Sequence, residues 1–173
     1  VTLIDDILRL SQLDEGGALP HEQVSLLELA QEAARSLTEQ AAAQAVHISV
    51  TGTAGTVFGV RRLLYEIARN LCENAVKYNV PGGSVTVEVA ETDRDVTLLV
   101  RDTGIGIPEE DQSRVFERFY RVDKSHSRAI GGTGLGLSIV KHAVAYHHGT
   151  LRLESQPGKG TAITVTLPKK LTE

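Results

Sequence analysis

The stretch VRRLLYEIARNLCENAVKYN, residues 60–79, carries the clearest pattern in this chain of 173 residues. Its apolar side chains recur at i, i+3, i+4 and i+7, which predicts an amphipathic helix over about residues 60–78. The apolar positions are Leu63, Leu64, Ile67, Ala68, Leu71, Cys72 and Ala75. A helix with such a stripe buries it against other elements, so we expect this segment to pack on a core.

Polar side chains lie beside the apolar stripe of the same helix. Asn70, Asn74, Lys77 and Tyr78 stand at i, i+4, i+7 and i+8, on one side of the helix. One interpretation is a solvated polar face. The other is a site for Mg²⁺ and a nucleotide, because an Asn carbonyl ligates Mg²⁺ without adding negative charge and a lysine neutralises phosphate. The spacing alone leaves both interpretations open.

A glycine cluster, GGTGLG at 131–136, runs into apolar residues with helical spacing. A glycine-rich loop at a helix start offers unpaired N–H groups and the positive end of the dipole, which suit a phosphate. The spacing excludes a dinucleotide fingerprint because Leu137 takes the place of its last glycine, and it lacks the G-K-[ST] ending of a P-loop. A flexible hinge is the alternative.

The segment RDTGIGIP, residues 101–108, places Asp102 at the end of an expected strand, with Gly104 and Gly106 after it. An ionised carboxylate accepts hydrogen bonds, for example from the exocyclic amine of adenine, and glycines let a flat ring approach the backbone. An Asp-Gly turn that closes a hairpin is the simpler interpretation.

The segment FERFYRVD, residues 116–123, concentrates aromatic and cationic side chains. They are Phe116, Arg118, Phe119, Tyr120 and Arg121. Apolar rings of this kind anchor a movable loop while an arginine reaches a phosphate, or they simply pack in the core.

The remaining segments complete a fold of mixed helices and strands. We expect helices over 1–14, 25–44, 109–118 and 134–148, with Ser25 as a cap and Glu28 three residues later. Strands are expected at 46–51 and 56–59, in a hairpin at 85–89 and 96–100, and in a second hairpin around PGKG with Leu151, Leu153, Ile163, Val165 and Leu167. Residues 120–131 are polar and irregular. This order predicts an α+β, two-layer fold: a mixed, mostly antiparallel sheet with helices on one face.

Composition sets further bounds. The length suits one domain, and 41% hydrophobic with 23% charged residues is ordinary for a globular protein. Cys72 is the only cysteine, so an internal disulfide is excluded. A net charge of −4 argues against nucleic acid as the main partner. Because the chain starts at Val1 rather than Met, we expect it to be a piece of a longer protein.

The order of the motifs is more specific than any one of them. The Asn helix, D-x-G-x-G, F-x-x-F and G-x-G-x-G, followed by GKGT at 158–161, resembles the ATP-binding catalytic domain of bacterial sensor histidine kinases. That domain is of the type shared with gyrase, Hsp90 and MutL. The opening LIDDILRLSQLDEG resembles the end of the second dimerisation helix in these kinases. The resemblance implies a Bergerat-type fold with three parts: 1–15 as the end of that helix, 16–24 as linker and 25–173 as catalytic domain.

The resemblance also assigns roles on the Asn helix. It implies that Asn74 is the principal Mg²⁺ ligand with Asn70 assisting, and that Lys77 contacts phosphate with Tyr78 beside the nucleotide. Glu73 would polarise the attacking histidine. Asn79 departs from the family, which often has Ser or Thr there, and we expect little effect.

Further residues are assigned to the nucleotide by the same resemblance. Asp102 would bind the adenine amine, with Gly104, Gly106, Ile107 and Thr161 around the base. Arg118, Arg121, Lys124 and a lid over about 121–131 would close over the phosphates. The backbone around the triphosphate would come from Gly132, Thr133, Gly134, Leu135, Gly136 and Leu137.

The function implied is transfer of the γ-phosphoryl group of ATP, with Mg²⁺, to a histidine on a dimerisation domain that is mostly absent here. An aspartate of a response regulator would then receive it. The complete protein is expected to be a phosphorylated homodimer, with this part on the cytoplasmic side of a membrane that it reaches through its absent N-terminal part, and with no role in nucleic acid binding. A gyrase- or Hsp90-type ATPase, or a non-catalytic nucleotide-sensing module, are the alternatives.

One of the six histidines lies in a segment that resembles the phosphoacceptor motif of the family. HEQVSL, from His21, partly matches the family's H-E-x-x-[ST]-P but lacks the proline and follows the second-helix segment, so we expect the acceptor upstream. The cluster His142, His147 and His148 has no carboxylate or cysteine at ligand spacing, which favours packing or surface roles over a metal site. His126 lies in the expected lid.

Overall fold

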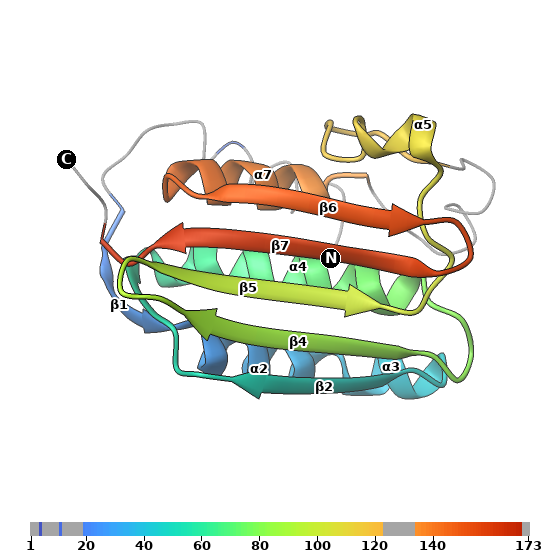
Figure 1. The fold of residues 1–173 in the computed structure, drawn as a ribbon, viewed down its shortest axis with the longest axis horizontal. Coiled ribbons are helices and arrows are strands. Elements are labelled where there is room, and N and C mark those ends of the chain that lie inside the picture. Colours follow the sequence, from blue (N-terminus) through green and yellow to red (C-terminus); the bar gives the residue numbers. More distant parts are fainter. Residues whose placement is uncertain (1–3, 5–10, 12–18, 123–133, 171–173) are drawn as a thin grey trace.

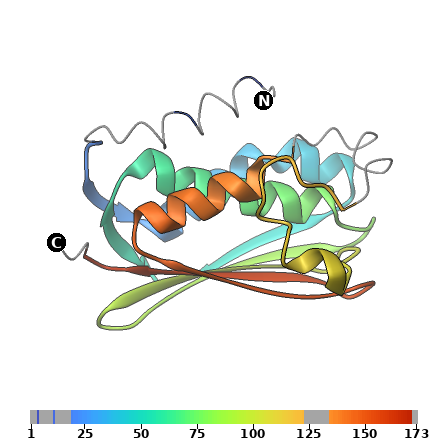
Figure 2. The same cartoon turned by 90° about the horizontal axis from the view of Figure 1, so that it is seen from above.

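A computed structural model describes residue 4, residue 11, residues 19–122 and residues 134–170. Strands form one layer and helices the other, so the predicted two-layer arrangement is confirmed (Figures 1 and 2). The helices are α2 (Leu26–Ser36), α3 (Thr38–Ala43), α4 (Arg61–Lys77), α5 (Glu109–Gln112) and α7 (Gly136–Tyr146). The strands are β1 (Glu22–Ser25), β2 (His47–Gly52), β3 (Thr56–Gly59), β4 (Ser84–Glu91), β5 (Asp95–Asp102), β6 (Thr150–Gln156) and β7 (Gly160–Pro168).

The main sheet has the order β2-β4-β5-β7-β6. Only β2 and β4 pair in parallel within it, and the other neighbours are antiparallel, as the mixed, mostly antiparallel prediction requires. Helix α4 packs on β4 and β5 and lies between α2 and α7 (Figure 1). None of the helices in the described part of the chain has the length and apolar character that a membrane-spanning segment needs.

The core lies between the sheet and the helices α2, α4 and α7. All seven apolar positions of the predicted stripe are buried in α4, and the alternating valines and leucines of the first hairpin point into the same core. Those strand positions are Val85, Val87, Val89, Val96, Leu98 and Val100. The two periodicities, 3.6 in the helix and 2 in the strands, therefore identify the same buried layer from opposite sides.

A second, two-stranded sheet joins the start of the domain to its end. Strand β1 pairs with β3, and the N–H of Phe58 in β3 donates to the carbonyl of Lys169, directly after β7, at 3.0 Å. Sequence reasoning missed β1, which lies largely inside the predicted linker 16–24, because its four residues carry a single buried apolar side chain, Val24. The domain boundary itself stays a prediction.

Two predicted helices are shorter than expected. The prediction of a single helix over 25–44 is wrong, because the helix is interrupted at Leu37. The N–H of Leu37 donates to the carbonyl of Ala34, and the Thr38 hydroxyl donates to the Arg35 carbonyl at 2.9 Å. Such side-chain bonds compete with the helical ladder. The expected cap is present, with Ser25 Oγ accepting from the N–H of Glu28 at 3.3 Å. The predicted helix over 109–118 is reduced to α5, of four residues, and the chain then continues in turns.

Histidine 147 is fully buried at the end of α7. Its Nδ1–H donates to the carbonyl of Ala143 at 2.7 Å, and its Nε2 accepts the N–H of Val60 at 3.1 Å, so both ring nitrogens are used by the neutral ring. The predicted packing role of His147 is thus confirmed. The ring of His21 lies between those of Phe58 and Tyr146, with centroids at 5.7 and 5.8 Å. Within the described ranges, no three His, Cys, Asp or Glu side chains are grouped for a metal.

Replacing His147 by Gln should cost more stability at pH 8 than at pH 5. Burial lowers the pKa of His147 below its ordinary value of 6.5, so the folded protein binds fewer protons than the unfolded chain. The contribution of the neutral ring is therefore complete above pH 6.5 and is lost as the pH falls below it. We expect a loss of about 1–3 kcal/mol at pH 8. Urea unfolding of both proteins at the two pH values tests this, and an equal loss at both would contradict it.

Candidate nucleotide-binding site

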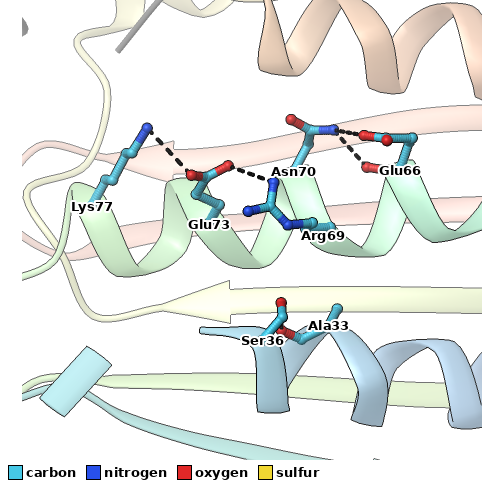
Figure 3. A network of polar contacts seen from close by, with 7 residues as sticks. All are labelled: Ala33, Ser36, Glu66, Arg69, Asn70, Glu73 and Lys77. Atoms are coloured by element: carbon cyan, nitrogen blue, oxygen red, sulfur yellow. Dashed lines mark hydrogen bonds and ion pairs between the residues drawn. The ribbon is translucent and has the colours of Figure 1, made fainter. Parts of the chain in front are cut away.

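Asn70 is a buried amide in the middle of α4, and its orientation is fixed. Its Nδ2 donates to the backbone carbonyl of Glu66 at 2.8 Å and to the Glu66 carboxylate at 3.1 Å (Figure 3). The other end of the amide faces α7, because a Cβ added to Gly136 would lie 3.1 Å from Asn70 Oδ1. The structure thereby joins the predicted Asn helix to the predicted glycine segment.

Glu73 lies one turn further along, between two cations. Its carboxylate is 3.5 Å from Arg69 Nη1 and 3.6 Å from Lys77 Nζ, at i−4 and i+4, and all three side chains are mostly buried (Figure 3). Asn74 is partly buried, and its backbone carbonyl accepts the N–H of Tyr78 at 3.0 Å. The face predicted from spacing therefore exists as one row of charges and amides on α4.

The end of α4 meets the loop after β5. The carbonyl of Tyr78 accepts the N–H of Ile105 at 3.0 Å, and a Cβ on Gly104 would lie only 2.2 Å from that same carbonyl. Glycine at 104 is therefore required for the loop to approach the helix. Asn79 supports this junction, since its Nδ2 donates to Ala75 and Ser84 carbonyls and its Oδ1 accepts from Val80 and Thr103. Asn79, the residue that departs from the family pattern, thus has a structural role: it links the end of α4 to the neighbouring loops.

Asp102 ends β5 with a half-buried carboxylate. Its Oδ1 accepts the N–H groups of Gly104 at 2.9 Å and Thr161 at 3.2 Å. Burial raises the pKa of the carboxyl to about 6, and the two backbone donors oppose that rise. A carboxylate held at a net electrostatic cost is typical of a functional group rather than of a stabilising one.

The second hairpin closes the other side of the Asp102 loop. Ser155 Oγ accepts the N–H of Ile107 at 2.8 Å and lies 2.8 Å from Thr161 Oγ1. Gly106, at φ +72°, passes so close to the carbonyl of Gln156 that a Cβ would lie 2.1 Å from it. The predicted residues Gly106, Ile107 and Thr161 are therefore brought together with Asp102. Ser155 was missed, because one serine on a hairpin strand forms no pattern.

The glycine segment enters α7 beside the aromatic segment. Gly134, at φ +79°, accepts the N–H of Phe119 at 2.9 Å, and a Cβ on it would lie 2.9 Å from the Phe119 backbone. Leu135 is fully buried, Gly136 is the first residue of α7, and Leu137 packs against the core. Glycine is thus needed at 134, where the backbone approaches Phe119, and Gly136 makes a tight contact with Asn70.

The two arginines of the aromatic segment take different positions. Arg121 lies close enough to Tyr78 for its positive charge to oppose the burial that raises the pKa of that phenol. Among the described residues, Arg121 Nε is a buried nitrogen without a hydrogen-bond partner. Arg118 is exposed and contacts Nε2 of His142 on α7 at 3.3 Å. Lys124, Gly132, Thr133, His126 and lid positions 123–131 lie outside the described residues.

The comparisons with known proteins agree with this geometry. The family described as histidine kinase-, DNA gyrase B-, and HSP90-like ATPase matches residues 59–171. The chain is 42% identical over 171 residues to the sensor-like histidine kinase SenX3 of Mycolicibacterium smegmatis, covering 96% of this chain and 44% of that protein. It is 49% identical over 107 residues to the sensor histidine kinase WalK of Bacillus subtilis, covering 61% of this chain and 18% of that protein.

Solved structures lead to the same group. The mycobacterial sensor histidine kinase MprB superposes with a TM-score of 0.76 at 33% identity, over 88% of this chain and all of that one. Full-length ShkA in complex with AMPPNP superposes with a TM-score of 0.84 at 25% identity, over 98% of this chain and 36% of that one. The family match over residues 59–171 includes α4, the Asp102 loop and the start of α7. The chain belongs to the histidine kinase-, DNA gyrase B-, and HSP90-like ATPase family. Within that family it is a catalytic domain of the sensor histidine kinase kind, and it spans less than half the length of the curated relatives it matches.

Replacing Asp102 by Asn should stabilise the protein at pH 8 in the absence of nucleotide. Asn keeps an oxygen for the two backbone donors and removes the buried charge. Because the folded-state pKa is raised from 3.8 to about 6, the cost of that charge is present above pH 6 and disappears as the pH falls towards 4. We expect a gain of roughly 1 kcal/mol after allowance for partial exposure.

Thermal unfolding of the two proteins at pH 8 and pH 4.5 measures this gain. A midpoint that is unchanged or lower in the variant at pH 8 would show that the carboxylate stabilises the fold.

Proposed function

We propose that the chain binds Mg²⁺–ATP and, in the complete protein, catalyses transfer of the γ-phosphoryl group to a histidine of a dimerisation domain. The proposal is supported by two segments that both contact α4. The loop after Asp102 donates the N–H of Ile105 to the Tyr78 carbonyl, and Gly136 of α7 lies against Asn70 Oδ1. Amide oxygens, a lysine, a carboxylate and a glycine-led helix start thereby surround one helix face. The AMPPNP complex of the structural relative ShkA supports a nucleotide as the ligand.

The residues present fit a magnesium nucleotide. Asn70 directs a neutral oxygen away from Glu66, and Asn74 is one turn further along the same face. Mg²⁺ takes such oxygens together with waters and phosphate oxygens. When bound, it would neutralise charge on the transferring phosphates. Asn74 and Asn70 are the proposed ligands.

The phosphates would be held by cations and by backbone N–H groups. Lys77 is within 3.6 Å of Glu73 and would exchange that partner for a phosphate oxygen. Arg121 Nε, buried without a described partner, is a second donor for an anion. The start of α7 at Gly136 has no side-chain cap, so its N–H groups would donate to the triphosphate.

The base would be recognised at the other end of the row. Asp102 Oδ1 is occupied by the N–H groups of Gly104 and Thr161, so the second carboxylate oxygen would accept the adenine amine. Phosphoryl transfer would then depend on positioning and charge neutralisation, with Glu73 polarising the incoming histidine. Transfer onward to a response-regulator aspartate, a homodimeric complete protein and a place on the cytoplasmic side of a membrane are part of the same proposal.

Asn74→Ala should remove the Mg²⁺-dependent part of ATP binding, a loss of about 100-fold, while the fold is kept. The contact that Asn74 makes to Tyr78 uses its backbone oxygen, which alanine retains. Calorimetric titration with ATP, in Mg²⁺ and in EDTA, measures the effect. Gln31→Ala, which removes an exposed amide from α2, is the matched control and should bind like the wild type. Unchanged Mg²⁺ dependence in Asn74→Ala would contradict the site.

Incubation with γ-labelled ATP and a separately made helix-pair domain should give acid-labile, base-stable phosphate on that domain. The Asn74→Ala chain should give none. Release of free phosphate without labelling of the helix-pair domain would instead favour an ATPase of the gyrase or Hsp90 type.

A further inference from the structure

We propose that the carboxylate of Glu66 is a positioning group that, together with the backbone carbonyl of the same residue, determines which end of the Asn70 amide faces the nucleotide. The inference rests on the proposed function and adds to it a residue that the motif-based assignment does not include. Glu66 is one turn before Asn70 on α4, and both side chains are buried, with 8% and 7% of their surface exposed. A buried carboxylate needs hydrogen-bond donors, and the amide of Asn70 supplies one of them.

The contact between Asn70 and Glu66 is possible in only one orientation of the amide. An amide has a donor end and an acceptor end of nearly the same shape, so packing alone does not choose between them. Asn70 faces two oxygens of Glu66, the backbone carbonyl at 2.8 Å and the carboxylate at 3.1 Å. Both only accept hydrogen bonds, so only the NH₂ end can face them. The carbonyl end is therefore turned away from Glu66, as Figure 3 shows.

The direction of that carbonyl end matters because of what lies opposite. Gly136, the first residue of α7, stands where a Cβ would be 3.1 Å from Asn70 Oδ1. The oxygen is thereby presented to the glycine-led helix start, where the proposed site holds phosphate and Mg²⁺. If the amide were reversed, its NH₂ group would face the cation, and an NH₂ group of an amide cannot act as a ligand of Mg²⁺. Glu66 thus acts on Mg²⁺ through Asn70, without touching the metal itself.

The test replaces Glu66 by Met, which has a similar length and suits a helix but lacks the carboxylate acceptor, while the backbone carbonyl acceptor at residue 66 is kept. Affinity for ATP is measured by calorimetry in Mg²⁺ and in EDTA, on the whole chain. We expect Glu66→Met to weaken binding in Mg²⁺ by about tenfold, the loss of one hydrogen bond to a charged group, and to leave binding in EDTA unchanged. Glu66→Gln keeps an acceptor and should stay within about twofold of the wild type. Glu32→Met, which removes a glutamate of α2 that pairs with Arg61 of α4, is the control.

A double-mutant cycle separates positioning from a merely structural role. In an Asn70→Ala background, Glu66→Met should weaken Mg²⁺-dependent binding no further, because the amide that it orients is gone. Equal losses in Mg²⁺ and EDTA, an unchanged Mg²⁺ affinity in Glu66→Met, or a full additional loss in the Asn70→Ala background would each overturn the inference. If the wild-type chain itself binds ATP with no dependence on Mg²⁺, the proposed function fails rather than the role of Glu66 within it.

Discussion

The packing of α4 on three sides is the constraint on which the rest of the domain depends. The helix buries its apolar stripe on β4 and β5 and is flanked by α2 and α7. The polar side chains of the helix, among them Asn70 and Glu73, therefore lie close to the core. Polar groups so close to a core need partners, and two of them find partners within the helix: Asn70 bonds to Glu66, and Glu73 pairs with Arg69 and Lys77. The candidate site is therefore prepared before any ligand arrives.

Around this row the site is assembled mainly by backbone. The Tyr78 carbonyl receives the loop after Asp102, the Asp102 carboxylate receives two N–H groups, and Gly136 brings the start of α7 against Asn70. Backbone groups cannot be moved by rotamer changes, so they hold the loops at fixed distances. This explains why glycine is needed at Gly104 and Gly106, where a Cβ would lie 2.2 and 2.1 Å from a backbone oxygen.

Much of this was predictable from the sequence, for physical reasons. The apolar period of α4 and the alternation in β4 and β5 are dictated by burial, and spacing alone put Asn70 and Asn74 on one face. The prediction from sequence failed where local hydrogen bonds, rather than apolar periodicity, determine the structure. Leu37 interrupts a helix that its composition favours, and β1 is too short for periodicity. Ser155 and Glu66 lie outside the motifs and contact residues that belong to them, Ile107 and Thr161 in the first case and Asn70 in the second. A polar residue whose task is to orient another leaves no spacing of its own, so only coordinates reveal it.

The bond between Phe58 and Lys169 has a structural consequence. It fastens the β1–β3 ribbon, which receives the chain from its N-terminal side, to the end of β7, and β7 runs without interruption from there back to Thr161 (Figure 1). One continuous strand therefore connects the ribbon at the entrance of the domain with Thr161, whose N–H donates to the Asp102 carboxylate.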